Sequence, residues 1–121
     1  MLTIKKYSKE DYMNMIARAI QDVVGDRCLI IFFGSILTDK FGRTSDIDVA
    51  LYCKDELSSK EYLKILEQIE NLPILREVDL VDIKRINNVE LIENILKGKV
   101  WKDIPELLKD LKKHTENLKR S

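Results

Sequence analysis

The stretch CLIIFFGSILTDKFGRTSDIDVALYC, residues 28–53, specifies the architecture of this chain. Residues 28–33 are a continuous apolar run, typical of a strand whose two faces are both covered, and Gly34-Ser35 ends the run. A polar, glycine-containing stretch follows over residues 38–45. The next eight residues alternate, which predicts a second strand. One face would carry Asp46, Asp48, Ala50 and Tyr52, and the other Ile47, Val49, Leu51 and Cys53.

Apolar residues at helical spacing predict helices on both sides of this unit. The first begins after Ser8 and ends near Gly25, and a capping box of Ser58 and Glu61 begins the second, which closes at residues 72–73. Residues 77–83, EVDLVDI, predict a third strand. From residue 88 we expect a short helix, a short strand at 100–101, and a last helix capped by Asp103 and Glu106. The predicted class is α/β (α+β), a small mixed sheet of three to four strands flanked by helices.

Length and composition predict one compact domain over residues 1–121. The chain is 45% hydrophobic, which suffices for a single core, and it contains no Gly/Ser/Pro-rich linker. Its 21 basic and 21 acidic residues cancel, which argues against bulk nucleic-acid binding. No run approaches the roughly 20 apolar residues that span a bilayer, and the first residues lack the apolar core of a signal peptide. We therefore expect a cytoplasmic protein without a membrane segment.

Cysteine and histidine chemistry is not expected to carry the function. Cys28 and Cys53 each lie in an apolar run without a CxxC pair, so we expect buried, reduced thiols. The single histidine, His114, lies in a highly charged segment and is expected on a solvated helix face. Catalysis would then depend on carboxylates, hydroxyls and a bound metal.

Three carboxylates form the candidate metal site. Asp46 and Asp48 share a strand face about 7 Å apart, and at an effective dielectric near 20 their charges repel by roughly 2.5 kcal/mol. Asp79, in the third predicted strand, would increase this repulsion. Magnesium takes oxygen ligands and leaves positions open for substrate phosphates, so it is the expected cation.

Gly34-Ser35 supplies the second half of a candidate site. Glycine permits a close approach of the backbone to a phosphate, and exposed amides with a hydroxyl can bind its oxygens. Alone, the pair fits an ordinary turn, and the acidic pair fits a solvated strand end. Together they indicate metal-dependent phosphoryl or nucleotidyl transfer.

The spacing adds a family resemblance. Ten residues separate Gly34-Ser35 from Asp46-x-Asp48, and this G-S-x10-D-x-D pattern resembles the signature of the DNA polymerase β-like nucleotidyltransferase superfamily. The strand EVDLVDI resembles its third-carboxylate strand, and the small size resembles its minimal members, the MNT proteins. The resemblance covers residues 28–83, and more loosely the segment NVELIENILKGKVWKD.

The resemblance implies a role for each matching residue. Gly34 and Ser35 would hold the triphosphate of ATP or another NTP, and Asp46 and Asp48 would bind magnesium. Asp79 would share one metal ion and orient or deprotonate the acceptor hydroxyl. Asp82, on the opposite face of the same strand, is the alternative third carboxylate. We favour Asp79 because the resemblance places the acid just before the alternating apolar pair.

The sequence departs from the family after Gly34-Ser35. Many MNT relatives continue with x-A-R-G, whereas residues 36–39 here read ILTD, so an arginine that could meet the phosphates is missing. Lys40 and Arg43 are the candidate replacements.

The resemblance also implies a function. Minimal members of this kind are antitoxins that adenylylate a HEPN ribonuclease toxin, so the expected activity is Mg-dependent transfer of AMP to a tyrosine of such a partner, within a hetero-oligomer. A non-catalytic antitoxin that neutralises its partner by contact is the first alternative. Transfer to a small molecule, such as an aminoglycoside, is the second.

Overall fold

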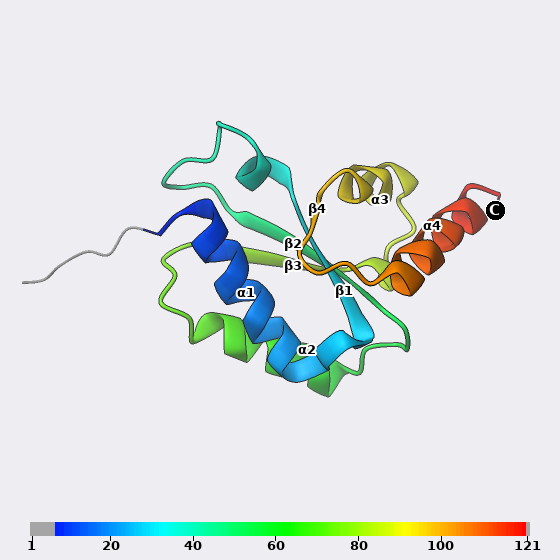
Figure 1. The fold of residues 1–121 in the computed structure, drawn as a ribbon, viewed down its shortest axis with the longest axis horizontal. Coiled ribbons are helices and arrows are strands. Elements are labelled where there is room, and N and C mark those ends of the chain that lie inside the picture. Colours follow the sequence, from blue (N-terminus) through cyan, green and yellow to red (C-terminus); the bar gives the residue numbers. More distant parts are fainter. Residues whose placement is uncertain (1–6, 121) are drawn as a thin grey trace, which may run out of the picture.

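The fold is a four-stranded mixed sheet between two pairs of helices (Figure 1). The computed structural model describes residues 7–120. The helices and strands, in chain order, are α1 (Lys9–Val24), β1 (Cys28–Phe33), β2 (Ile47–Cys53), α2 (Ser59–Glu70), β3 (Val78–Asp82), α3 (Val89–Leu96), β4 (Lys99–Val100) and α4 (Pro105–Lys119). Short 3-10 turns η1 (Gly25–Arg27), η2 (Gly34–Leu37) and η3 (Ile83–Arg85) follow α1, β1 and β3. The predicted class is confirmed.

Sheet topology brings the two strands of residues 28–53 to the centre. The strand order is β3-β2-β1-β4, with β2 and β3 parallel and the other pairs antiparallel. All six residues of β1 are buried, as expected of a strand covered on both faces. The carboxyl end of β1 therefore meets the beginning of β2, and the beginning of β3 lies beside it.

Each face of the sheet has its own apolar core, and the alternation in β2 predicts which side chain enters which. Val49 and Leu51 pack with α1 and α2, while Ala50 and Tyr52 pack with α3 and α4. Asp48 lies on the same face as Ala50, near the beginning of the strand. The alternation also determines on which side of the sheet the Asp48 side chain lies. A shift of the strand by one residue would turn this side chain toward the core that packs with α1 and α2.

Capping explains the helix beginnings, with one correction. Ser8 with Asp11 and Ser58 with Glu61 form the capping boxes of α1 and α2. The predicted caps of the last helix are wrong, because α4 begins after Ile104 without a side-chain cap. Pro105 is tolerated as the first residue of this helix because the amide of that position has no partner within the helix.

Two further predictions are corrected by the packing. Cys28 and Cys53 are directly opposed in the β1–β2 pair and form a disulfide, so they are not free thiols. His114 is not on a solvated face. Its ring lies 5.8 Å from that of Tyr52, and its Nε2 atom is buried without a hydrogen-bond partner.

Within residues 7–120, none of the helices has the length and apolar character needed to cross a membrane.

Tyr52 is buried, and its hydroxyl donates to Asp110 Oδ2 over 2.6 Å. Burial, followed by this carboxylate, raises the pKa of Tyr52 far above its usual value of 10.0. The α4 helix is thereby fixed to the sheet at the end that carries the disulfide.

Candidate functional site

Gly34 ends β1 with a sharp change of backbone direction. Its φ of +81° lies in the left-handed region that favours glycine. The chain then enters η2, where the Ser35 carbonyl accepts hydrogen bonds from the amide and the hydroxyl of Thr38, both over 2.9 Å. The Gly34-Ser35 turn is therefore held by its own local contacts, close to the beginning of β2.

Asp48 lies between this turn and Asp79. In the strand register Asp48 is paired with Phe33, the residue before Gly34, and on its other side with Asp79. A Cβ atom built on Gly34 would overlap Asp48 Oδ2. The structure thus brings Gly34, Asp48 and Asp79 together, from three different elements.

The charges of the carboxylates act on one another. Partial burial is the main cause that raises the pKa of Asp48 above 3.8, and the negative charges of Asp79 and then Asp46 raise it further. Asp46 itself lies just before β2 and is exposed, as is Asp79. A bound cation would lower the electrostatic cost of ionising Asp48.

The donor atoms fit a hard cation, although they are not gathered around a single point. Carboxylate oxygens are the ligands that Mg²⁺ prefers, and Asp46, Asp48 and Asp79 could supply them. Across residues 7–120, no group of three His, Cys, Asp or Glu side chains is arranged closely enough to hold a metal ion. Sharing one ion would therefore require these side chains to rotate toward each other.

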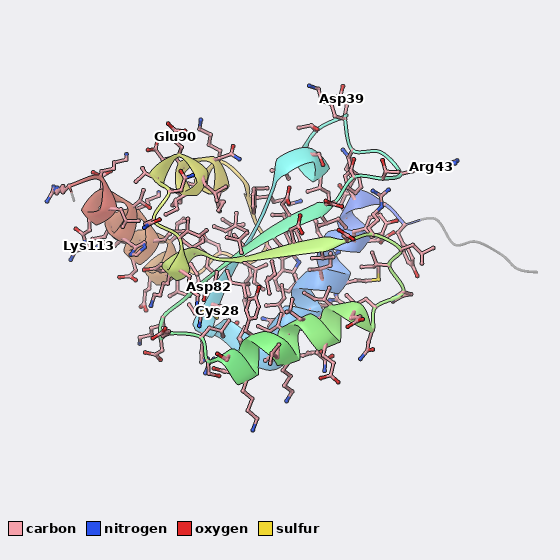
Figure 2. All side chains as sticks on the ribbon, turned by 180° about the vertical axis from the view of Figure 1, so that it is seen from behind. Cys28, Asp39, Arg43, Asp82, Glu90 and Lys113 are labelled. Atoms are coloured by element: carbon pink, nitrogen blue, oxygen red, sulfur yellow. A yellow bond between two sulfur atoms is a disulfide. The ribbon has the colours of Figure 1, made fainter. Side chains whose placement is uncertain are left out.

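Asp82, the alternative third carboxylate, is engaged elsewhere. Its Oδ1 accepts from the Lys84 amide over 3.3 Å, and its Oδ2 lies 3.5 Å from Arg85 Nε. Figure 2 shows Asp82 well away from the loop that carries Arg43. The side chain caps η3, so its local contacts give it a structural role.

The two candidate replacements for the missing arginine lie in the loop between η2 and β2. Lys40 and Arg43 are both exposed, and Figure 2 shows Arg43 pointing outward at the tip of the molecule. The Lys40 amide donates to Thr38 Oγ1 over 3.2 Å. Neither side chain is brought to Asp48 by a contact in the structure, so their role as phosphate ligands stays a prediction.

Sequence reasoning missed Arg76. This side chain lies just before β3, and its Nη1 atom donates to the carbonyls of Gly42 and Ser45 in the loop before β2. Arg76 belongs to no recognisable local motif. The one signal in the sequence is its position shortly before a strand that carries acidic residues. The contact connects the segment that leads to Asp79 with the segment that leads to Asp46.

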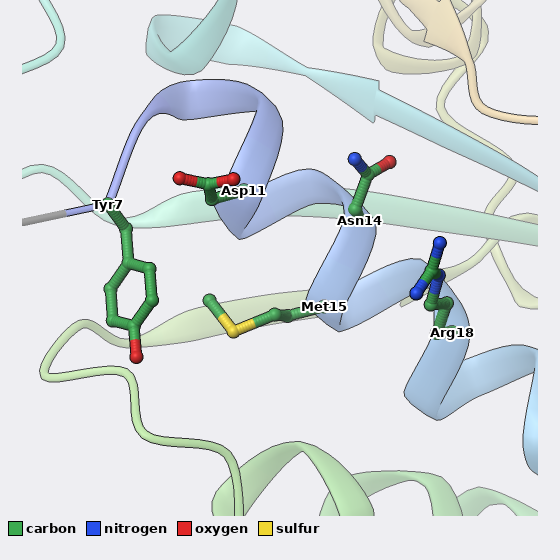
Figure 3. A pocket seen from close by; sticks show the side chains of 5 residues that line it. All are labelled: Tyr7, Asp11, Asn14, Met15 and Arg18. Carbon is green, nitrogen blue, oxygen red and sulfur yellow. The ribbon is translucent and has the colours of Figure 1, made fainter.

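Two cavities lie near α1 and α2. One of about 370 Å³ lies beside the beginning of β3, and both Arg76 and Asp79 line it. The other, of about 310 Å³, lies along α1 and is shown in Figure 3, lined by Tyr7, Asp11, Asn14, Met15 and Arg18. The predicted site residues do not line the second cavity, and its Asn14 accepts a hydrogen bond from Trp101 Nε1 over 3.0 Å. Of the two, the cavity beside Asp79 adjoins the carboxylates.

The chain resembles a known protein family. The family model described as polymerase beta, nucleotidyltransferase matches residues 7–105. No curated protein matches the chain significantly.

Solved structures with a similar fold come from toxin–antitoxin complexes. A chain of the tri-AMPylated Shewanella oneidensis HEPN toxin in complex with MNT antitoxin is 21% identical, with a TM-score of 0.68, over 93% of this chain and 87% of that one. A chain of a toxin–antitoxin with AMP-PNP is 23% identical, with a TM-score of 0.71, over 88% and 86%. A chain of the MntA–HepT toxin–antitoxin is 21% identical, with a TM-score of 0.64, over 90% and 85%. At these identities the likeness shows a shared fold.

Proposed function

Because this chain belongs to the polymerase beta nucleotidyltransferase family, we propose that it transfers AMP from ATP to a hydroxyl group of a partner protein. One observation carries the proposal: Asp48 lies between the Gly34-Ser35 turn and Asp79. The turn that would bind phosphate therefore lies next to two carboxylates on neighbouring strands. The same three elements would therefore serve nucleotide, metal and acceptor.

Each residue has a distinct task in this proposal. The backbone at Gly34 and the Ser35 hydroxyl bind the phosphate oxygens, because no side chain at Gly34 blocks their approach. Asp46, Asp48 and Asp79 would hold Mg²⁺. When bound, magnesium neutralises the charge of the phosphates and of the reaction's transition state. Lys40 and Arg43 add positive charge from the neighbouring loop.

The chemical step is a substitution at the α-phosphorus of ATP. The acceptor oxygen forms a bond to that phosphorus while the bond to the oxygen bridging to the β-phosphate breaks, and pyrophosphate leaves. Asp79 takes the proton of the acceptor hydroxyl, directly or through water. Its exposed position at the beginning of β3 suits it to meet an acceptor from outside the chain.

The acceptor we propose is a tyrosine of a HEPN-type toxin, with this chain as its antitoxin in a hetero-oligomer. The support is indirect: one neighbour in fold is a complex that contains an AMPylated HEPN toxin, and another contains AMP-PNP. We further propose that residues 1–121 act as one domain and that the partner contributes to the surface that docks the acceptor. A cytoplasmic location stays a prediction.

Labelled ATP tests the proposal directly. The chain, Mg²⁺ and a HEPN-type partner are incubated with ATP labelled at the α-phosphate, and label in the partner is measured. Wild type should transfer label, and Asp48→Asn should not, since it removes a metal-binding carboxylate. Asp82→Asn is the matched control and should transfer normally. Transfer by Asp48→Asn at the wild-type rate would contradict the assignment of the metal site.

A contact-only antitoxin is the second candidate. The residues after Gly34-Ser35, ILTD, lack an arginine, and this departure favours a weakened nucleotide site. An antitoxin that acts by contact alone would protect cells from its partner equally well as wild type and as the Asp48→Asn variant. Protection that is lost in Asp48→Asn supports the enzyme.

A further inference from the structure

Arg76 connects the two segments that carry the carboxylates. It lies three residues before Asp79, and its Nη1 atom donates to the carbonyl of Gly42 and, over 3.1 Å, to the carbonyl of Ser45. Ser45 immediately precedes Asp46. A single guanidinium therefore fixes the backbone of the loop at two points, one of them adjacent to a predicted metal ligand.

Aromatic rings hold the guanidinium in place. Its central carbon lies 4.2 Å from the ring centroid of Phe41 in the loop and 5.1 Å from that of Tyr12 in α1. The two rings contact each other edge to face, with centroids 6.2 Å apart. Cation–π contacts of this kind are attractive, so the rings limit the movement of the guanidinium. The loop, α1 and the segment before β3 thus meet at Arg76.

A second cation from α1 strengthens the same attachment. Lys9 Nζ donates to the Thr38 carbonyl and lies 5.9 Å from the Phe41 ring centroid. Thr38 is the residue whose amide and hydroxyl close the turn at Ser35. The loop is thereby held at its beginning by Lys9 and at its end by Arg76.

We propose that Arg76 is a positioning residue that sets the geometry of residues 38–46 for nucleotide binding, an inference that rests on the proposed function. Lys40 and Arg43 flank Phe41 and Gly42, two of the residues that Arg76 contacts. Because Phe41 and Gly42 are held, the backbone positions of Lys40 and Arg43 are held as well. From these positions both cations would reach toward a triphosphate. Arg76 acts through this backbone and does not itself contact the reacting atoms.

The planar guanidinium suits this task better than an ammonium. Its Nη1 atom donates to two carbonyls while the flat group lies against two aromatic rings, and a lysine ammonium has no flat surface to stack on them. Arg76 is half-buried and contributes no side chain to either apolar core. Its removal should therefore release the loop while the sheet and its helices keep their packing.

Two measurements on Arg76→Ala and Arg76→Lys test the proposal. In the transfer assay, Arg76→Ala should raise the KM for ATP by about tenfold, the order expected when a binding group is misplaced, while the KM for the acceptor stays unchanged. Arg76→Lys should resemble Arg76→Ala. In limited proteolysis, trypsin should cut after Lys40 and Arg43 faster in both variants than in wild type. Phe41→Leu, which removes one ring, should change both readouts in the same direction by less.

Arg27→Ala is the matched control, since Arg27 forms an ion pair with Glu61 at the opposite end of β1. It should leave the KM for ATP and the cleavage after Lys40 and Arg43 unchanged. Unchanged loop cleavage in Arg76→Ala, or wild-type behaviour of Arg76→Lys in both readouts, overturns the inference. If wild type neither binds ATP nor transfers AMP, the proposed function fails, and loop cleavage still decides whether Arg76 holds the loop.

Discussion

Gly34 and Asp48 approach so closely that the space between them cannot hold a methyl group. A Cβ on Gly34 would overlap Asp48 Oδ2 and lie 3.3 Å from Cγ. Because Asp48 is also paired with Asp79, any change at Gly34 would be transmitted to the carboxylates. The turn and the acidic site are therefore one structural unit.

Alanine at Gly34 tests this unit, and Gly25 provides the matched control. Both glycines have a positive φ, +81° and +60°, and alanine in that region costs roughly 1–2 kcal/mol. Only at Gly34 does the added atom meet a side chain, since nothing lies within 4 Å of a Cβ at Gly25. We expect both variants to lose stability in urea, Gly34→Ala by more because of the overlap with Asp48, and only Gly34→Ala to lose ATP binding in calorimetry. Equal ATP binding by the two variants would show that Gly34 is only a turn residue.

The stability of the protein should respond to the ionisation of Asp48. Burial and the charges of Asp79 and Asp46 raise its pKa above 3.8, so the folded state binds this proton more tightly than the unfolded state does. The ionised side chain therefore lowers the free energy of unfolding as pH rises through the raised pKa. Without divalent metal and near neutral pH, Asp48→Asn should be more stable than wild type.

That advantage should shrink as pH falls through the raised pKa and should be lost below 3.8, where Asp48 is protonated in both states. Thermal unfolding across the acidic range measures the difference between the two proteins. A constant difference at all pH values would mean that hydrogen bonding, and not charge, separates them.

Asp79 and Asp82 should differ in transfer. Asp79→Asn removes the exposed carboxylate beside Asp48 and should eliminate transfer of label, with little loss of stability. Asp82→Asn keeps an oxygen that can accept from the Lys84 amide, loses only the contact with Arg85, and should cost no more than about 1 kcal/mol. The reverse order of severity in the transfer assay would assign the catalytic role to Asp82.

Phosphate binding should depend on both the turn and the loop. Ser35→Ala should weaken ATP binding by about 1–3 kcal/mol, the range for a hydrogen bond to a charged group. Replacing Lys40 and Arg43 together by alanine should weaken binding of ATP more than that of AMP, because the extra phosphates carry the extra charge. Calorimetric titration in magnesium gives both affinities. Equal affinity of wild type and these variants for ATP would favour the contact-only antitoxin.

The disulfide should contribute to stability. Cys28 and Cys53 close a loop with a sequence separation of 25 residues, and closing such a loop stabilises by up to about 3 kcal/mol in the chain-entropy description. Reduction by dithiothreitol should therefore lower the midpoint of urea unfolding in wild type. Cys28→Ser combined with Cys53→Ser should unfold at one midpoint with or without the reductant. A midpoint in wild type that ignores the reductant would contradict the contribution.

Local sequence patterns were enough to predict the elements and the faces of the strands. The continuous apolar run of β1 predicts burial on both faces of the strand. The alternation of β2 predicts which side chains share a face, because successive side chains of a strand point to opposite sides. The spacing of Gly34-Ser35, Asp46 and Asp48 predicted the candidate site through the family resemblance, and the antiparallel pairing of the two strands brings these residues to one end of the sheet. Those predictions needed no knowledge of distant contacts.

Contacts between segments that are far apart in the chain could not be predicted from the sequence, because they depend on how whole helices and strands pack. The register of β3 against β2 places Asp79, and not Asp82, beside Asp48. Arg76 reaches Ser45 across 31 residues, Cys28 meets Cys53 across 25, and Tyr52 reaches Asp110 across 58. His114 likewise leaves the solvated face because α4 packs on Tyr52. No local pattern encodes the partner of such a side chain, because the partner depends on how helices and strands settle against one another.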